Sequence, residues 1–161
     1  MLFHQGELGR CVVEVQEAVE RRSNSINKLH TLLETRTETL ALLNQLAGMR
    51  PFKPDEGVQA LLQEFCESLV DYTASAHFQL YKFIEDGTER RTVIKDIAAK
   101  VYPRISNTTQ FILDFNEKYE DDSQFSDLQN LDRDLSQLGE VLADRITEED
   151  KIIEILTQSR G

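Results

Sequence analysis

The chain has 161 residues, enough to bury a core of its own, and we expect residues 1–161 to form a single helical domain. Hydrophobic residues make up 40% of the chain, which argues against global disorder. With 7 glycines and 3 prolines, it has too few turn-forming residues for a many-stranded β fold. No apolar run approaches the ~18 residues of a membrane span, and residues 1–20 do not resemble a signal peptide. The predicted location is therefore the cytoplasm.

The net charge of −11 is concentrated in one part of the chain. Residues 114–150 hold 13 acidic and 3 basic residues, whereas residues 1–113 hold 15 acidic and 13 basic ones. Such a field repels nucleic acid and attracts a basic partner. The alternative is that the charge serves only solubility. We therefore expect no direct contact with nucleic acid, and the pattern predicts no particular oligomeric state.

Apolar residues recur at helical spacing in the first half of the chain. Residues 7–21 predict a short N-terminal helix. A long helix should run from a cap near residue 24 to Gly48, and another from Asp55 to about residue 84. The inward stripes predicted for these two long helices are Ile26, Leu29, Leu33, Leu40, Leu43 and Ala47, then Leu62, Phe65, Leu69, Thr73, Ala76, Leu80 and Phe83.

The second half continues the helical pattern. Residues 85–88 predict a turn and residues 90–102 a shorter helix. Pro103 either ends this helix or opens the next one, which is expected over 104–119. A last helix is expected from a cap at Ser123 or Ser126 to about residue 157. The inward positions predicted for these segments are Ile94, Ile97 and Val101, then Ile105, Thr108, Ile112 and Phe115, then Leu128, Leu131, Leu135, Leu138, Leu142, Ile146, Ile153 and Leu156. The fold class is thus all-α, a four-helix up-down bundle core with extra short helices.

Motifs for catalysis or metal binding are missing from the sequence. It has no Gly-rich phosphate loop, no GxSxG, no HExxH and no Glu-x-x-His pair of a di-iron bundle. The run Glu148-Glu149-Asp150 is interpreted as a solvated helix face, because adjacent helix positions diverge by about 100°. We expect no enzyme activity, no metal and no cofactor.

One face of the helix predicted over 55–84 suggests a binding surface. On a helical wheel, Phe78 lies opposite the core stripe and between acidic residues, with Val70, Ala74 and Tyr81 at its border. A solvent-facing Phe with apolar neighbours is typical of a protein-binding anchor. The alternative is that another helix of the chain covers it. The candidate partner-binding residues are Glu67, Asp71, Ser75, Phe78, Tyr81 and Lys82. His77 is interpreted as a partly buried, hydrogen-bonded histidine.

Residues 65–81 read Phe-Cys-Glu-Ser-Leu-Val-Asp-Tyr-Thr-Ala-Ser-Ala-His-Phe-Gln-Leu-Tyr. This segment resembles the signature F-C-x-x-L-V-D-Y-x-S-A-G-H-F-x-x-Y of the Rsd/AlgQ family of bacterial anti-sigma regulators. Weaker matches at Leu46–Pro51, at Tyr102-Pro103 with residues 107–110, and at Leu138–Lys151 extend the resemblance over about residues 25–157. Residues 1–23 match the family weakly. Tyr72 and His77 are expected to be structural members of the motif.

The resemblance implies a four-helix bundle that binds the C-terminal domain of the primary sigma factor, the domain that reads the −35 promoter element. That domain is a helix-turn-helix with a basic surface, since it grips phosphates. This sequence departs from the family at His30-Thr31-Leu32, where the family has D-R-W. Two other readings stay open: an adaptor that binds signalling proteins of carbon or stringent-response control, and a metal-binding or haem-binding helical bundle.

Overall fold

The computed structural model describes residues 29–53, 56–81, 92–120 and 128–158. The first helix covers residues 29–47, and α2 spans Glu56–Ala76 and continues directly into a π-helical turn, η1, at His77–Tyr81. Two long helices follow, α4 at Thr92–Tyr119 and α5 at Leu128–Gln158. The predicted all-α class is confirmed, since no strand occurs in the described parts of the chain. The helix predicted over 7–21 and the turn at 85–88 lie outside the described residues.

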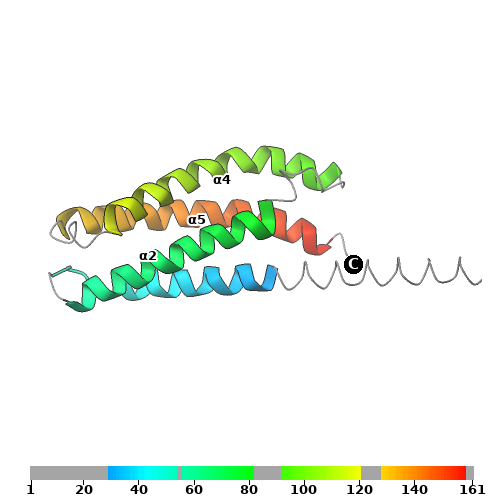
Figure 1. Ribbon diagram of the computed structural model, residues 1–161. Helices are drawn as coiled ribbons and strands as arrows, with labels where there is room; N and C mark the ends of the chain where they lie inside the picture. Colours follow the sequence, from blue (N-terminus) through cyan, green and yellow to red (C-terminus); the bar gives the residue numbers. More distant parts are fainter. Residues whose placement is uncertain (1–28, 54–55, 82–91, 121–127, 159–161) are drawn as a thin grey trace, which may run out of the picture.

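Consecutive helices run in opposite directions, so the bundle has the predicted up-down arrangement (Figure 1). The helix at 29–47 lies against α2, and α4 packs most extensively on α5. Buried residues of all four long helices join in one hydrophobic core. The C-terminal end of α2 and the N-terminal end of α4 therefore meet at the same end of the molecule (Figure 1).

The buried stripe of the helix at 29–47 differs from the predicted one. Leu32, Leu42 and Leu46 are buried beside Leu29, whereas the predicted Leu33, Leu40, Leu43 and Ala47 are half-buried. Leucines occur in adjacent pairs at 32–33 and 42–43, so periodicity alone cannot decide which member of each pair faces inward. Thr39 fixes the orientation, because its buried hydroxyl lies 2.8 Å from the hydroxyl of Ser68 on α2.

Pro103 does not end a helix, which corrects the predicted break. Helix α4 runs through it without interruption and is curved along its length (Figure 1). Pro103 is exposed, while Val101 and Ile105 on either side of it are buried. A proline inside a helix costs about 3 kcal/mol, which the burial of a continuous apolar face on α5 outweighs.

The core positions of α5 recur with a strict alternation of four and three residues. They are Leu131, Leu135, Leu138, Leu142, Arg145, Glu149, Ile152 and Leu156, all of which are buried. The predicted Ile146 and Ile153 are half-buried. The interpretation of residues 148–150 as a solvated face is therefore wrong for Glu149, which has no exposed surface. A 3.5-residue repeat keeps one seam facing the neighbouring helices, and here two charged residues occupy that seam.

Candidate functional site

A buried ion pair links three helices beneath the outer surface of α2. Arg145 and Glu149 lie one turn apart on α5, and Arg145 Nε donates a hydrogen bond to Glu149 Oε1 at 2.8 Å. Tyr72 on α2 donates its hydroxyl to the same oxygen at 2.6 Å. Arg145 Nη1 reaches α4, where it donates to Thr109 Oγ1 at 2.8 Å and to Thr108 Oγ1 at 3.1 Å. The pair thereby fixes α2, α4 and α5 relative to one another.

The electrostatics of this cluster follow from burial and from its two charges. Burial alone would lower the pKa of Arg145, but the adjacent Glu149 carboxylate more than compensates, so that pKa lies above its usual value. Burial, together with the Glu149 carboxylate, raises the pKa of Tyr72 and of Tyr81. Arg36 of the first helix lies 3.6 Å from Glu149 Oε2 and adds a second positive charge. Arg145 thus stays charged, and both phenols stay protonated at neutral pH.

An apolar pocket of about 330 Å³ lies above this cluster, between α2 with η1 on one side and α4 on the other. Val70, Phe78 and Leu113 line it and are 47%, 58% and 50% exposed. Among the described residues, Val93 is the one other large hydrophobic side chain with comparable exposure. The exposed apolar surface of the described chain is therefore concentrated around this pocket. Residues lining the pocket include Thr73, Ala74, Tyr81, Tyr102, Ile105, Ile112 and Asn116.

A second hollow adjoins the first and is acidic. It is lined by Glu67, Asp71 and Glu120, and it shares Val70 and Asn116 with the apolar pocket. All three carboxylate-bearing residues are exposed. An apolar hollow beside an acidic one can take a partner that presents an apolar group next to a basic one.

Cys66, on the wall of the acidic hollow, is buried and chemically quiet. Burial and the nearby Glu120 and Glu67 raise the pKa of its thiol to about 12. The thiolate that would act as a nucleophile is therefore almost absent at neutral pH.

The helical wheel located most of the predicted surface. Phe78, Asp71 and Glu67 are exposed, and Ser75 is half-buried. Their role in binding stays a prediction. Lys82 lies outside the described residues. Tyr72 is fully buried, and its structural role in the motif stays a prediction.

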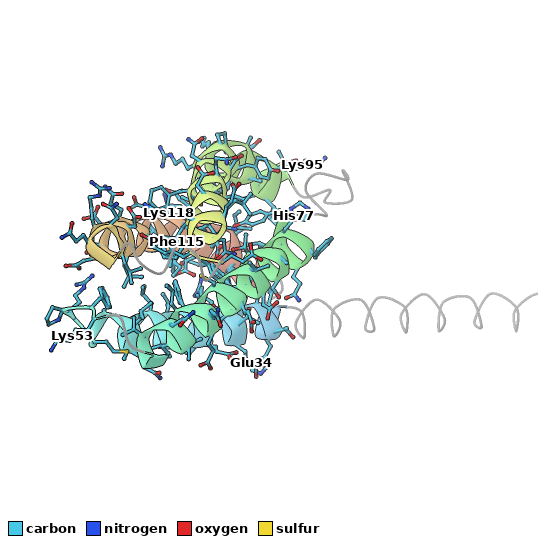
Figure 2. The ribbon with its side chains drawn as sticks, turned by 60° about the vertical axis from the view of Figure 1, so that its left-hand side comes forward. Glu34, Lys53, His77, Lys95, Phe115 and Lys118 are labelled. Atoms are coloured by element: carbon cyan, nitrogen blue, oxygen red, sulfur yellow. The ribbon has the colours of Figure 1, made fainter. Side chains whose placement is uncertain are left out.

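The predictions for His77 and Tyr81 need correction. His77 is exposed rather than partly buried, and its ring makes an edge contact with Phe78 at 5.2 Å. Tyr81 is buried, and its ring packs against that of Tyr102. Both residues belong to η1, where hydrogen bonds run from i to i+5, so the 3.6-residue wheel misplaces these two side chains, although it places Phe78 and Leu80 of the same turn correctly. Figure 2 shows His77 at the same end of the bundle as Lys95 of α4.

Several residues of the site were not found by sequence reasoning. Leu113, Asn116 and Tyr102 come from α4, whose relation to α2 no local pattern reveals. The burial of Arg145 and Glu149 could have been predicted, because both occupy consecutive inward positions of the 3.5-residue repeat in α5. A charged residue at such a position faces other helices.

Within the parts of the chain that the structure describes, no three His, Cys, Asp or Glu residues are placed to hold a metal ion. In the same residues, no helix combines the length and apolar character that crossing a membrane requires.

Comparison with known proteins places the chain in one family. A sequence model described as "Regulator of RNA polymerase sigma(70) subunit, Rsd/AlgQ" matches residues 11–157, so the match begins earlier than the motifs indicated. The "Regulator of sigma D" of Yersinia enterocolitica is 32% identical over 151 residues, 89% of each chain. The protein of the same name from Yersinia pseudotuberculosis is 31% identical, over 89% of this chain and 88% of its own. That of Enterobacter sp. strain 638 is 32% identical, over 87% and 86%. No solved structure matches.

Proposed function

Because the chain belongs to the Rsd/AlgQ family of regulators of the RNA polymerase sigma(70) subunit, we propose that it is an anti-sigma factor that binds the C-terminal domain of the primary sigma factor. The contact surface is the outward face of α2 and η1 with the neighbouring part of α4. Binding is stoichiometric and involves no reaction. By covering the surface that reads the −35 element, the protein keeps the sigma factor from promoters.

The observation that carries this proposal is the pairing of an apolar rim with acidic residues. Val70, Phe78 and Leu113 are exposed around one pocket, and Glu67, Asp71 and Glu120 line the adjoining hollow. A DNA-reading helix-turn-helix exposes Lys and Arg for phosphate contacts. A negatively charged surface with an apolar centre complements such a domain in charge and supplies the desolvated contacts from which most affinity comes.

The residues on this face have separable roles. Phe78 is the apolar anchor, and Asp71, two turns earlier on α2, accepts charge-assisted hydrogen bonds from Arg of the sigma factor. Glu67 extends the acidic face by one more turn, and Ser75 offers a hydroxyl between Asp71 and Phe78. Tyr81 contributes from inside, because it lines the pocket beneath Phe78 without being exposed itself.

Truncation of Phe78 tests the proposal. Removing an anchor costs about 2 kcal/mol, so Phe78→Ala should weaken binding to the isolated C-terminal sigma domain roughly thirtyfold, as measured by calorimetry. Its melting temperature should stay within about 2 °C of the wild type, because the side chain is 58% exposed. Asp71→Ala should also weaken binding by about tenfold, the value of one charge-assisted hydrogen bond.

Val93→Ala is the matched control. Val93 is 62% exposed on α4 but does not line the pocket, so this variant should bind the sigma domain like the wild type. Equal affinities of Phe78→Ala and Val93→Ala would remove the α2 face from the interface. Absence of any complex between the wild-type protein and the sigma domain would reject the anti-sigma function itself.

A further inference from the structure

One residue that lines the apolar pocket carries a buried polar atom that the described residues leave unsatisfied. The amide oxygen of Asn116 has no hydrogen-bond partner in the described parts of the chain. Asn116 is 6% exposed and lines the pocket. Buried polar atoms of folded proteins are almost always paired, because an unpaired one keeps its full desolvation cost. A group that enters the pocket from outside can remove that cost.

We propose that this pocket binds a small, uncharged aromatic molecule that carries a hydrogen-bond donor. The volume of the pocket, about 330 Å³, lies at the lower end of the range for small-molecule pockets. Val70, Ile105 and Ile112 supply apolar walls, which favour a flat hydrocarbon body. The donor pairs with the Asn116 oxygen, which is a hydrogen-bond acceptor.

The charges around the pocket indicate that the molecule is neutral. Arg145 lines the pocket, but its charge is already compensated by Glu149 at 2.8 Å. An anion in the pocket would be repelled by the carboxylates of Glu67 and Asp71, because the acidic hollow that they line shares Val70 with the pocket. A cation would lose its hydration against apolar walls with a guanidinium close by. An uncharged molecule avoids both penalties.

Occupation of the pocket should also affect partner binding, a consequence that rests on the proposed function. Phe78 and Val70 belong both to the pocket lining and to the surface assigned to the sigma factor. If a ligand and the sigma domain compete for these side chains, each weakens the binding of the other by the same factor.

Indole and indene form a suitable pair of probes, because they have the same shape and indole alone carries an N–H donor. Titration of the protein alone, followed by calorimetry or ligand-observed NMR, should show saturable indole binding with a Kd near or below ~1 mM. Indene should bind about tenfold more weakly, as expected when one hydrogen bond to a buried acceptor is lost.

Two variants and one control variant localise the binding. Ala74→Trp places a large ring at an exposed position that lines the pocket and should abolish indole binding. Ala99→Trp is its control, since Ala99 is exposed on α4 outside the pocket, and should bind indole normally. Asn116→Leu removes the unpaired oxygen and should erase the preference for indole over indene. Circular dichroism checks that each variant is folded.

The outcomes separate this proposal from the anti-sigma function, because the titration contains no sigma factor. No saturable indole binding, or undiminished binding by Ala74→Trp, overturns the pocket as a small-molecule site even if the sigma complex forms. Saturable binding with the expected variant effects supports it even if no sigma complex forms. Addition of indole to the sigma complex then tests whether the two compete.

Discussion

Glu149 shows how much the environment of a single residue decides its role. It lies between Glu148 and Asp150 in sequence, yet it alone of the three is fully buried, against Arg145, Tyr72 and Arg36. Replacing one partner of a buried ion pair leaves the other charge uncompensated. The three adjacent acids therefore differ in what they contribute to stability.

We expect Glu149→Ala to lower the free energy of unfolding by about 3–5 kcal/mol, because Arg145 would remain charged in the core. Asp150→Ala removes the neighbouring carboxylate, which is 54% exposed and pairs with Arg36 at 2.8 Å, and should cost less than about 1 kcal/mol. Urea unfolding of both variants measures the difference. Similar losses in the two would mean that Glu149 is hydrated in solution.

Cys66 makes the free energy of unfolding depend on pH in the alkaline range. Its pKa rises from 9.0 in an unperturbed thiol to about 12 in the folded protein, so above pH 9 the unfolded chain releases a proton that the folded one retains. The unfolded state is thereby favoured, and this contribution to stability, complete below pH 9, is lost as the pH rises toward 12. Tyr72 and Tyr81, whose pKa values are also raised, act in the same direction at still higher pH.

Cys66→Ala should therefore have a flatter dependence of unfolding free energy on pH than the wild type. Between pH 8 and pH 10 the wild type should lose about 1.4 kcal/mol more than the variant, one pKa unit's worth of free energy. Val58→Ala, which also truncates a buried side chain of α2 but removes no titrating group, should parallel the wild type. A Cys66→Ala curve parallel to the other two would show that the thiol ionises normally in the folded state.

At the scale of the helix, the sequence predicted elements better than it predicted their boundaries and faces. The helix at 29–47, α2 and α5 were expected from apolar periodicity, whereas α4 was expected as two shorter helices. Leu62, Phe65, Leu69, Ala76 and Leu80 of α2 and η1 are buried as predicted. The predicted break at Pro103 was wrong. The prediction rested on the low helix propensity of proline, whereas in the structure the packing of α4 on α5 outweighs that propensity. The choice between Leu32 and Leu33 depended on neighbours that no single helix reveals.

In the candidate site, too, features of a single helix could be predicted, whereas features that depend on several helices could not. The exposure of Phe78 could be predicted by continuing the helical wheel of α2 into η1, without knowledge of any other helix. The pocket could not, because half of its lining comes from α4 and its base from Arg145 of α5. The π-helical turn also rotated His77 outward and Tyr81 inward, and nothing in the spacing of apolar residues indicated a change from 3.6 residues per turn.

Gly139 offers a test of local propensity inside α5. A Cβ at this position would meet no atom within 4 Å, so Gly139→Ala adds no clash. Because glycine costs helix stability through backbone entropy, the variant should gain about 0.5–1 kcal/mol in unfolding free energy. The reverse change one turn later, Ala143→Gly at an exposed position, should lose a similar amount. A loss of stability in Gly139→Ala would mean that α5 bends or packs closely at this glycine.

At the scale of the whole molecule, much of the negative charge of α5 is used internally. Asp132 pairs with Arg50, Asp134 with Lys118, and Asp150 with Arg36, each at 2.7 to 2.8 Å. Glu148 lies 3.1 Å from both Arg104 and Lys151. Arg36 of the first helix and Arg104 and Lys118 of α4 thereby tie α5 to its neighbours, whereas Lys151 belongs to α5 itself. The acidic character of residues 114–150 therefore does not translate directly into a surface for a basic partner.

The exposed acidic residues next to the apolar pocket lie on α2 and at the end of α4. Glu67, Asp71 and Glu120 are exposed and line the hollow next to the apolar pocket. Binding to the sigma domain should weaken as salt rises from ~0.05 to ~0.5 M, since the Debye length then falls from roughly 14 Å to about 4 Å. The apolar contacts of Phe78 should persist over the whole range, so affinity should fall to a plateau rather than to zero.

Two pairs of charge-neutralising substitutions decide which carboxylates produce the salt dependence. The double variant Glu67→Gln with Asp71→Asn should bind about tenfold more weakly at low salt and show a shallower slope, because two rim charges contribute about 0.3–1 kcal/mol each. The matched variant Glu140→Gln with Asp144→Asn neutralises two exposed carboxylates of α5 that line neither hollow, and should keep the wild-type slope. Calorimetric titrations at several salt concentrations measure both.

If the α5 pair flattened the slope and the α2 pair did not, the sigma factor would approach along α5, and Phe78 would have to act at a distance from the attracting charge. Equal slopes in all three proteins would mean that neither pair of carboxylates produces the salt dependence. The predicted result ties the long-range attraction to the same few residues of α2 that surround the apolar anchor, so that the basic domain is drawn to the place where it can be held.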